Sequence, residues 1–410
     1  MKKILRTLSL VLVILFLGGL PAAAEKSPSL AVIHARLIDG TDAPPLDNAV
    51  IVIQDGRFLS VGPASGIAVP DGARVIDAAG RTVVPGLIDA HFHMNYPNTR
   101  AQPFVLNESV VSFRAAWHLR RHLLGGITTV MDAGAYHEVG FMAKHAFEEG
   151  LLLGSRPIVV GERINATGGH GVSRFDMALE ADGADGFRRA VRLQVKRGAD
   201  VIKLLPPYTR EELQAGIDEA HAWEKKAAVH SGWRHHGERL IRWAAELGAD
   251  VIEHAYALPD DVIELMGKKG IYSVPTMTIM MKLHAQRGKP IPKDRPHEYE
   301  VIFRKLRKAG VQTAVGTDAI YEFMNENPGL FFEEVERFVR NGCTPHQAII
   351  SATRIGAEAC GIDDRLGTIQ PGKTADFLIL GGDPLADIRH LRRSDIVIQA
   401  GRIIRDGPSR

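Results

Sequence analysis

The chain has 410 residues, of which 45% are hydrophobic and 24% are charged, and its formal net charge is +2. This is the composition of an ordinary globular protein, and the length suffices for a barrel-sized domain of roughly 250 residues with a smaller domain beside it. The near-neutral charge gives no electrostatic reason to expect nucleic-acid binding, and no apolar stretch beyond the N-terminus is long enough to span a membrane.

The first 24 residues have the pattern of a secretory signal peptide. Lys2, Lys3 and Arg6 form a basic start, residues 8–20 form an apolar run, and small residues precede the expected cleavage point after Ala24. We therefore predict export to the periplasm or to the outside of the cell, without stable membrane insertion after cleavage; the alternative is an uncleaved membrane anchor. Loss of residues 1–24 removes three basic and no acidic residues, which changes the formal net charge from +2 to −1.

Residues 25–85 and 365–410 have the same sequence pattern, in which short β-rich stretches alternate with turns. The expected strands are residues 31–37, 49–54, 58–61, 74–77, 377–380, 396–400 and 403–405. We expect the two ends of the chain to form one small composite β-sandwich domain.

Residues 86–364 alternate apolar strands with helical patterns. The expected strands are residues 87–90, 128–131, 158–160, 201–204, 227–230, 251–253, 271–274 and 313–315. The clearest helical patterns are residues 187–197, 210–225, 237–246 and 299–309. This alternation predicts an α/β fold with a parallel sheet covered by helices, and eight such strands suggest closure into a (β/α)8 TIM barrel.

Metal-binding or ionisable side chains stand at the ends of these strands. His91 and His93 end the first strand, and the two-residue period of a strand puts both imidazoles on one face. The later members of the set are Lys203 in the fourth strand, His230 in the fifth, His254 after the sixth and Asp318 after the eighth. Any one of these histidines alone would more often be an ordinary polar residue, but active sites of barrels form at the C-terminal strand ends. The joint pattern therefore predicts one metal centre.

Lys203 is unusual because it lies in an otherwise apolar strand. A buried ammonium group is costly unless it is paired or modified. Two interpretations stay open: the ammonium group meets a carboxylate or reaches solvent, or the amine reacts with carbon dioxide to form a carbamate. A carbamate has two oxygens that can bridge two cations, so the second interpretation favours a two-metal site.

Several motifs resemble the amidohydrolase superfamily, specifically its prolidase-like (Xaa-Pro dipeptidase) and imidazolonepropionase-related branch. The motifs are PGLIDAHFH at residues 85–93, GITTVMDAG at 126–134, TGGHG at 167–171, GADVIK at 198–203, EH at 253–254, GTD at 316–318, GTIQPGKTADF at 367–377 and GDPL at 382–385. They follow one another in the order of the family and cover essentially all of the mature chain. They are more specific for the superfamily than for the substrate.

The resemblance implies a (β/α)8 barrel that holds two divalent metal ions, usually zinc. The ligands implied for the first ion are His91, His93, N6-carboxylated Lys203 and Asp318. The ligands implied for the second ion are Lys203, His230 and His254. A hydroxide that bridges the ions would attack the scissile carbonyl group, and Asp318 would act as the catalytic proton shuttle to the leaving nitrogen.

Four further residues are candidates for contact with the substrate. In the prolidase-like branch a histidine at the place of His170 helps to bind or polarise the substrate carbonyl; the alternative is a loop residue that binds backbone. Tyr256 follows His254 by two residues and is a candidate for contact with a substrate carboxylate, or else it packs in the wall. Arg163 could bind a carboxylate through its forked guanidinium group. Trp233 could stack on an apolar substrate group.

The polar stretch at residues 278–299 is expected to be a long loop, either a lid over the site or a solvated segment without a role. A second departure from the family lies at residues 204–208, where LLPPY replaces a small glycine-rich loop. This changes the expected wall of the pocket.

Three functions stay open. We expect hydrolysis of a C–N amide or peptide bond in a dipeptide or an N-acyl amino acid. The first alternative is a cyclic-amide (imidazolone-like) hydrolase or a deaminase, but deaminating relatives usually keep one metal and lack a lysine at the place of Lys203. The second is an inactive binding barrel, which predicts a lost ligand, and none is lost. The expected partner is a small molecule or dipeptide, and a homo-oligomer is compatible with the sequence.

Overall fold

The computed structural model describes residues 29–94, 107–170, 178–231, 237–254, 256, 258–288, 291–292, 295–320 and 329–407 of the chain. The expected signal peptide, residues 1–24, and the candidate Trp233 lie outside these ranges. In the part of the chain that the structure describes, no helix is both long and apolar enough to cross a membrane.

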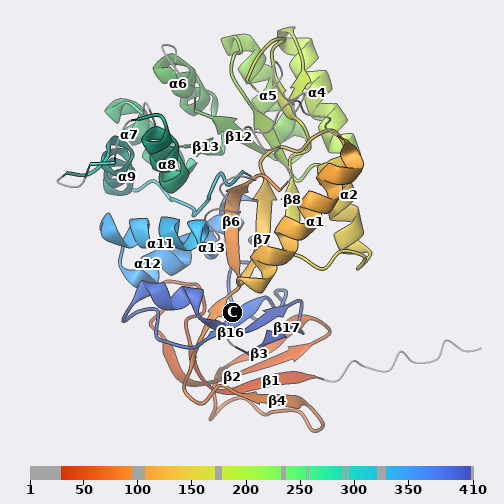
Figure 1. Cartoon of the computed structure of the whole chain (residues 1–410), viewed down its shortest axis with the longest axis vertical. Coiled ribbons are helices and arrows are strands. Elements are labelled where there is room, and N and C mark those ends of the chain that lie inside the picture. The colour runs from red at the N-terminus through yellow and green to blue at the C-terminus, as the bar shows by residue number, and fades with distance from the viewer. Residues whose placement is uncertain are drawn as a thin grey trace, which may run out of the picture.

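Both ends of the chain contribute to one eight-stranded sheet, which lies at the bottom of Figure 1. Its strands are β1 (Leu30–Leu37), β2 (Leu46–Gln54), β3 (Arg57–Pro63), β4 (Arg74–Asp77), β5 (Thr82–Pro85), β15 (Phe377–Leu380), β16 (Ser394–Gln399) and β17 (Arg402–Asp406). The order is β17-β16-β15-β5-β1-β2-β3, with β4 also paired to β1. The antiparallel pair of β5 and β15, with Leu378 opposite Val84, joins the two ends of the chain.

The turns of this sheet follow from the sequence. Asp55 and Gly56 both have positive φ, 49° and 75°, between the paired residues Gln54 and Arg57. Two left-handed residues in a two-residue loop match the right-handed twist of the flanking strands, and glycine adopts that conformation without steric cost. Phe58, at the start of the next strand, is buried in the core of this sheet.

The middle of the chain forms two parallel sheets. The first contains β6 (Leu87–Phe92), β7 (Ile127–Asp132) and β8 (Arg156–Val159) in that order. The second has the order β10 (Ala178–Glu180), β9 (Arg163–Asn165), β11 (Val201–Leu204), β12 (Lys226–His230), β13 (Val251–Glu253) and β14 (Tyr272–Val274). Every adjacent pair within these two sheets is parallel.

Helices separate most of these strands along the chain. They are α1 (Glu108–Leu124), α2 (Val139–Glu148), α4 (Gly183–Arg197), α5 (Arg210–Ala222), α6 (Gly237–Leu247), α7 (Asp260–Lys269), α8 (Met277–Gln286), α9 (Glu298–Lys308), α11 (Leu330–Arg340), α12 (Pro345–Ser351) and α13 (Arg354–Ala359), with a short 3-10 helix η1 (Ile388–Arg392). Helix α5 begins with a capping box in which the hydroxyl of Thr209 accepts from the backbone N–H of Glu212 and the Glu212 carboxylate accepts from that of Thr209. Its buried Leu213 belongs to the same core cluster as Ile202 of β11, so an apolar helix face covers the sheet.

The expected eighth strand is present only as isolated bridges, which pair Thr313 with Ser273 and Ala319 with Phe92. The backbone between them still joins the two sheets, because Ala314 donates to the carbonyl of Ser273 and Ala90 donates to that of Val315, each at 2.9 Å. Among the described residues the sheets do not form one continuous ring of eight strands. The extended backbone is interrupted next to this segment, where Asp318 has a φ of 49°.

The expectation of a long polar loop at residues 278–299 is wrong for its first half. Residues 277–286 form α8, and Met277, Ile279 and Met281 on this helix are buried. The helix forms because three of its four buried side chains are apolar. In addition, Glu334 of α11 accepts hydrogen bonds from the backbone N–H groups of Met277 and Thr278, each at 2.8 Å. Near the end of this stretch, helix α9 begins at the charged residue Glu298.

Candidate metal centre

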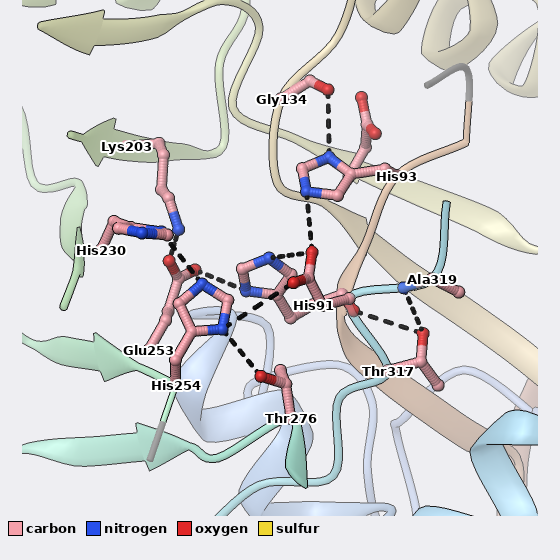
Figure 2. A network of polar contacts seen from close by, with 12 residues as sticks. His91, His93, Gly134, Lys203, His230, Glu253, His254, Thr276, Thr317 and Ala319 are labelled. Atoms are coloured by element: carbon pink, nitrogen blue, oxygen red, sulfur yellow. Dashed lines mark hydrogen bonds and ion pairs between the residues drawn. The ribbon is translucent and has the colours of Figure 1, made fainter. Parts of the chain in front are cut away.

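The structure brings together all six residues expected to bind metal. They come from the ends of β6, β11, β12 and β13 and from the segment that follows Thr313, and Figure 2 shows five of them labelled around one point. The five from the strands are buried, and the side chain of Asp318 is 19% exposed. The C-terminal strand ends therefore converge as predicted for a barrel site.

The first group consists of His91, His93 and Asp318. Oδ1 of Asp318 lies 3.3 Å from Nε2 of His91 and 3.1 Å from Nε2 of His93. The backbone fixes this approach, because the N–H of Asp318 donates to the carbonyl of His91 at 2.7 Å. Gly316 permits it, since a Cβ there would lie 2.3 Å from Cγ1 of Val274 and 2.9 Å from Cβ of His91. These three side chains offer donor atoms within 4.8 Å of one another, which is compatible with one shared ion.

The second group consists of His230 and His254 with Lys203 beside them. Nε2 of His254 lies 3.0 Å from Nδ1 of His230, and the ring centroids of His91 and His254 are 4.9 Å apart. The two groups are therefore adjacent. This arrangement fits two neighbouring cations.

In two of the histidines, Nδ1 has a hydrogen-bond partner outside the six candidate ligands. Nδ1 of His93 donates to the carbonyl of Gly134 at 3.3 Å, and Nδ1 of His254 is hydrogen-bonded to the hydroxyl of Thr276 at 2.7 Å. Nδ1 of His91 lies 3.1 Å from Oε1 of Glu253 without the alignment of a hydrogen bond. Histidines that bind metals typically use the second nitrogen in this way, which fixes the tautomer and the ring orientation.

The charge states suit a metal. Burial lowers the pKa of His93 to about 4 and lowers the pKa of His91, His230 and His254 as well, so these imidazoles are neutral near pH 7. Burial opposes ionisation of Asp318, but its contacts with the imidazoles of His91 and His93 hold its pKa well below its usual range. Neutral imidazoles and an ionised carboxylate are the forms that bind zinc and similar ions, so the residues present fit the implied metals.

Lys203 is buried in the same place, and its Nζ contacts Oε2 of Glu253. Burial, together with the nearby charge of Arg163, lowers the pKa of Lys203 well below its ordinary value. Of the two sequence interpretations, the contact with a carboxylate is thus seen directly. The lowered pKa favours the neutral amine, which is the form that reacts with carbon dioxide.

Glu253 was missed as a site residue by sequence reasoning. It ends β13 directly before His254, so strict alternation would place the two side chains on opposite faces. His254 instead has a φ of 69°, which ends the regular strand and lets both residues reach the centre. In the sequence, the only indication of a role for Glu253 is that it is a carboxylate in the otherwise apolar stretch 251–253.

Asp89, a residue of the PGLIDAHFH motif, holds the backbone next to Asp318 in place. Its carboxylate accepts from the backbone N–H of Thr317 at 3.0 Å and from the Thr317 hydroxyl at 2.7 Å. It thereby holds the residue next to Asp318 against β6. Burial raises the pKa of Asp89 to about 7.

Three of the four substrate-contact candidates are described, and all three adjoin the centre. The hydroxyl of Tyr256 lies 3.1 Å from Nε2 of His230, and its ring stacks on His254 at 5.2 Å. The ring of His170 lies 5.2 Å from that of His230. Arg163 is buried at the start of β9, and its charge contributes to the lowered pKa of both His170 and His93.

The chain is similar in sequence and in structure to several known hydrolases. Residues 82–403 match the model of the Amidohydrolase family. Ochratoxinase of Aspergillus niger is 28% identical over 419 aligned residues, which cover 90% of this chain and 84% of that protein. Imidazolonepropionase of Rhizobium rhizogenes is 26% identical and covers 85% of this chain and 90% of its own length. A solved Xaa-Pro dipeptidase with bound methionine in the active site is similar, with a TM-score of 0.80 at 29% identity, covering 92% of this chain and 100% of that chain.

Proposed function

The chain belongs to the amidohydrolase family, and from this premise we propose that it hydrolyses the amide or peptide C–N bond of a small substrate, a dipeptide or an N-acyl amino acid. The family and its relatives make the protein a hydrolase that acts on carbon–nitrogen bonds. They also confirm the resemblance to the prolidase-like branch that the motifs predicted.

One observation carries the proposal. Neutral, buried imidazoles of His91 and His93 converge on the ionised carboxylate of Asp318, and His230 and His254 lie directly beside them. A structural core rarely gathers so many ionisable side chains at one point, because each costs free energy when it is buried. A metal centre gives all of them a partner.

We propose two divalent ions, zinc by the character of the ligands, held by His91, His93 and Asp318 on one side and by His230 and His254 on the other. When bound, such ions lower the pKa of a coordinated water and polarise a carbonyl group. We further propose that Lys203 is N6-carboxylated and is shared by both ions. The burial of its side chain and its lowered pKa support this modification.

The residues of the chain then have separate tasks. Asp318 takes a proton from the attacking water and passes it to the leaving nitrogen. His170 and Tyr256 lie next to His230 and orient the substrate carbonyl and carboxylate. Arg163 supplies a buried positive charge that suits a substrate carboxylate. Trp233, outside the described residues, would contact an apolar substrate group.

The finer architecture belongs to the same proposal. We propose that residues 86–364 form a (β/α)8 barrel closed by the segment around Thr313, and that residues 25–85 and 365–410 form a composite β-sandwich domain. The bridges of Thr313 and Ala319 to the two parallel sheets support closure. We also propose export of the chain after removal of residues 1–24.

A second function is supported by the similarity to imidazolonepropionase, namely opening of a cyclic amide. The two functions differ in the leaving nitrogen, which stays attached to the product when a ring is opened. A deaminase is less compatible with a buried lysine at the centre, since deaminating relatives usually lack it.

Two measurements test the proposal. Metal analysis of the purified protein should give two ions per chain, and one ion per chain would exclude the bridged centre. A hydrolysis screen should then compare N-acyl amino acids and Xaa-Pro dipeptides with cyclic imidazolones, each with and without a chelator. Chelator-sensitive cleavage of the open-chain amides is expected, whereas ring opening alone would favour the second function.

A further inference from the structure

Glu253 lies at the proposed metal centre but has no role in the function proposed above. Its side chain is completely buried at the end of β13, between Lys203 of β11 and His91 of β6 (Figure 2). One carboxylate oxygen contacts Nζ of Lys203, and the other lies 3.1 Å from Nδ1 of His91. A single carboxylate thus contacts two residues expected to bind metal.

Comparison with other buried carboxylates shows that Glu253 has no structural task of the usual kind. Glu334 accepts from two backbone N–H groups at the start of α8, and Asp376 is paired with Arg156 and accepts from the backbone of Ala400. Within the described residues, neither oxygen of Glu253 has a hydrogen-bond partner, and neither do the atoms that face it, Nδ1 of His91 and Nζ of Lys203. Its neighbours are the groups of the metal centre.

The orientation of His91 follows from this contact. Its Nδ1 faces Glu253 and its Nε2 faces Asp318, 3.3 Å away. If Nε2 binds an ion through its lone pair, the proton of the neutral ring must be on Nδ1, and this nitrogen faces the carboxylate 3.1 Å away. A carboxylate behind a histidine ligand makes the imidazole a better donor and fixes its tautomer.

We propose that Glu253 is a positioning residue that sets the tautomer and direction of His91 and, through its other oxygen, holds the side chain of Lys203 at the same centre. This inference rests on the proposed function, because it assumes that the centre holds metal ions. It extends that function by a residue that acts through two ligands and binds no ion itself. Loss of Glu253 should therefore weaken metal binding although all six proposed ligands are still present.

The test is a titration of the metal-free protein with Co2+, followed by visible absorption. Wild type is compared with Glu253→Ala, Glu253→Gln and the control Asp376→Asn, which changes a buried carboxylate far from the centre in sequence and in contacts. Loss of a carboxylate behind a histidine ligand typically weakens binding by about 10- to 100-fold, so we expect that loss for Glu253→Ala together with an altered cobalt spectrum. Glu253→Gln keeps an oxygen that can accept from Nδ1–H but removes the negative charge, so its loss of affinity should be smaller than that of Glu253→Ala and still measurable.

Asp376→Asn should keep the affinity and spectrum of wild type, even when its thermal stability falls. Wild-type affinity and spectrum in both Glu253 variants would overturn the inference. If Glu253→Ala does not fold, Glu253→Gln alone decides, because it preserves the shape of the side chain: an unchanged spectrum and affinity would again overturn the inference. Failure of wild type to bind cobalt would instead overturn the proposed function.

Discussion

Oδ1 of Asp318 lies 3.1 Å from Nε2 of His93. In the sequence the two residues are far apart, since His93 follows β6 and Asp318 follows the bridge residue Thr313. The contact exists because the segment around Thr317 is hydrogen-bonded to β6 through Asp89 and the carbonyl of His91. The carboxylate of Asp318 therefore lies beside the two histidines with which it is proposed to bind an ion.

Asp318→Asn should abolish most of the activity while the protein stays folded. The amide keeps the size of the side chain but cannot accept a proton at neutral pH, and general acid–base catalysis typically contributes about 100- to 10,000-fold. We expect kcat to fall within that range for any substrate that the screen identifies. The measurement is steady-state kinetics together with metal analysis, and a variant with wild-type kcat would contradict the assignment of Asp318 as proton carrier.

Lys203→Ala should lose most of its activity and part of its bound metal. If the native residue is a carbamate, short carboxylates such as acetate or propionate can enter the space left by the side chain and restore part of both. If Lys203 acts only as the unmodified partner of Glu253, such acids should restore neither. Activity and metal content are measured at increasing acid concentrations, with chloride at equal ionic strength as the control. Full activity without added acid would exclude a bridging role.

Much of this fold follows from periodicity. The β-rich pattern at the C-terminal end predicts β15 at residues 377–380, but β5 (Thr82–Pro85), whose Val84 pairs with Leu378, is not among the expected strands. The parallel strands of the middle agree with their apolar runs. The third strand differs, because β8 and β9 are separate strands with Gly161 between them at a φ of 71°. Such an interruption depends on close packing against Phe141 and Gln194, which a single sequence does not reveal.

The convergence of the expected ligands was predictable because the C-terminal ends of parallel strands lie at one edge of a sheet. The surroundings of the ligands were not, since they depend on local backbone conformation. Thr276, which orients His254, has a left-handed φ of 46°, and His254 itself has a φ of 69°. No glycine marks either position, so the sequence does not indicate a left-handed backbone there. The alternation of side chains along a strand therefore predicts the wrong face for Glu253, and no pattern in the sequence points to Thr276.

Ile279→Ala tests the replacement of the expected loop by helix α8. Ile279 is 1% exposed and belongs to the same core cluster as Phe303 of α9. Removal of a buried isoleucine side chain costs about 2 to 5 kcal/mol, whereas a solvated loop would lose almost nothing. Urea denaturation measures the difference, with Leu151→Ala, a residue that is 78% exposed, as the control. Equal stability of the two variants would contradict the packing of α8.

Asp132→Asn should change the pH dependence of stability in the metal-free protein. Asp132 ends β7, is completely buried and accepts from the backbone N–H of Met94 at 3.1 Å; burial raises its pKa to about 7 from 3.8. Between these two pH values the unfolded chain has lost the proton and the native protein still holds it. Ionisation of the unfolded state therefore destabilises the fold progressively as pH rises from about 4 to about 7.

The variant has no such proton, and its amide oxygen can still accept from Met94. Relative to the variant, wild type should lose stability across that interval, on the order of 4 kcal/mol at about 1.4 kcal/mol for each unit of pKa difference, and the gap should be constant above it. Subtraction of the two denaturation curves at each pH cancels the titration of the buried histidines, which both proteins share. A difference that does not vary with pH would show that Asp132 is ionised in the native protein throughout, in which case the positive charge of Arg163 outweighs the cost of burial.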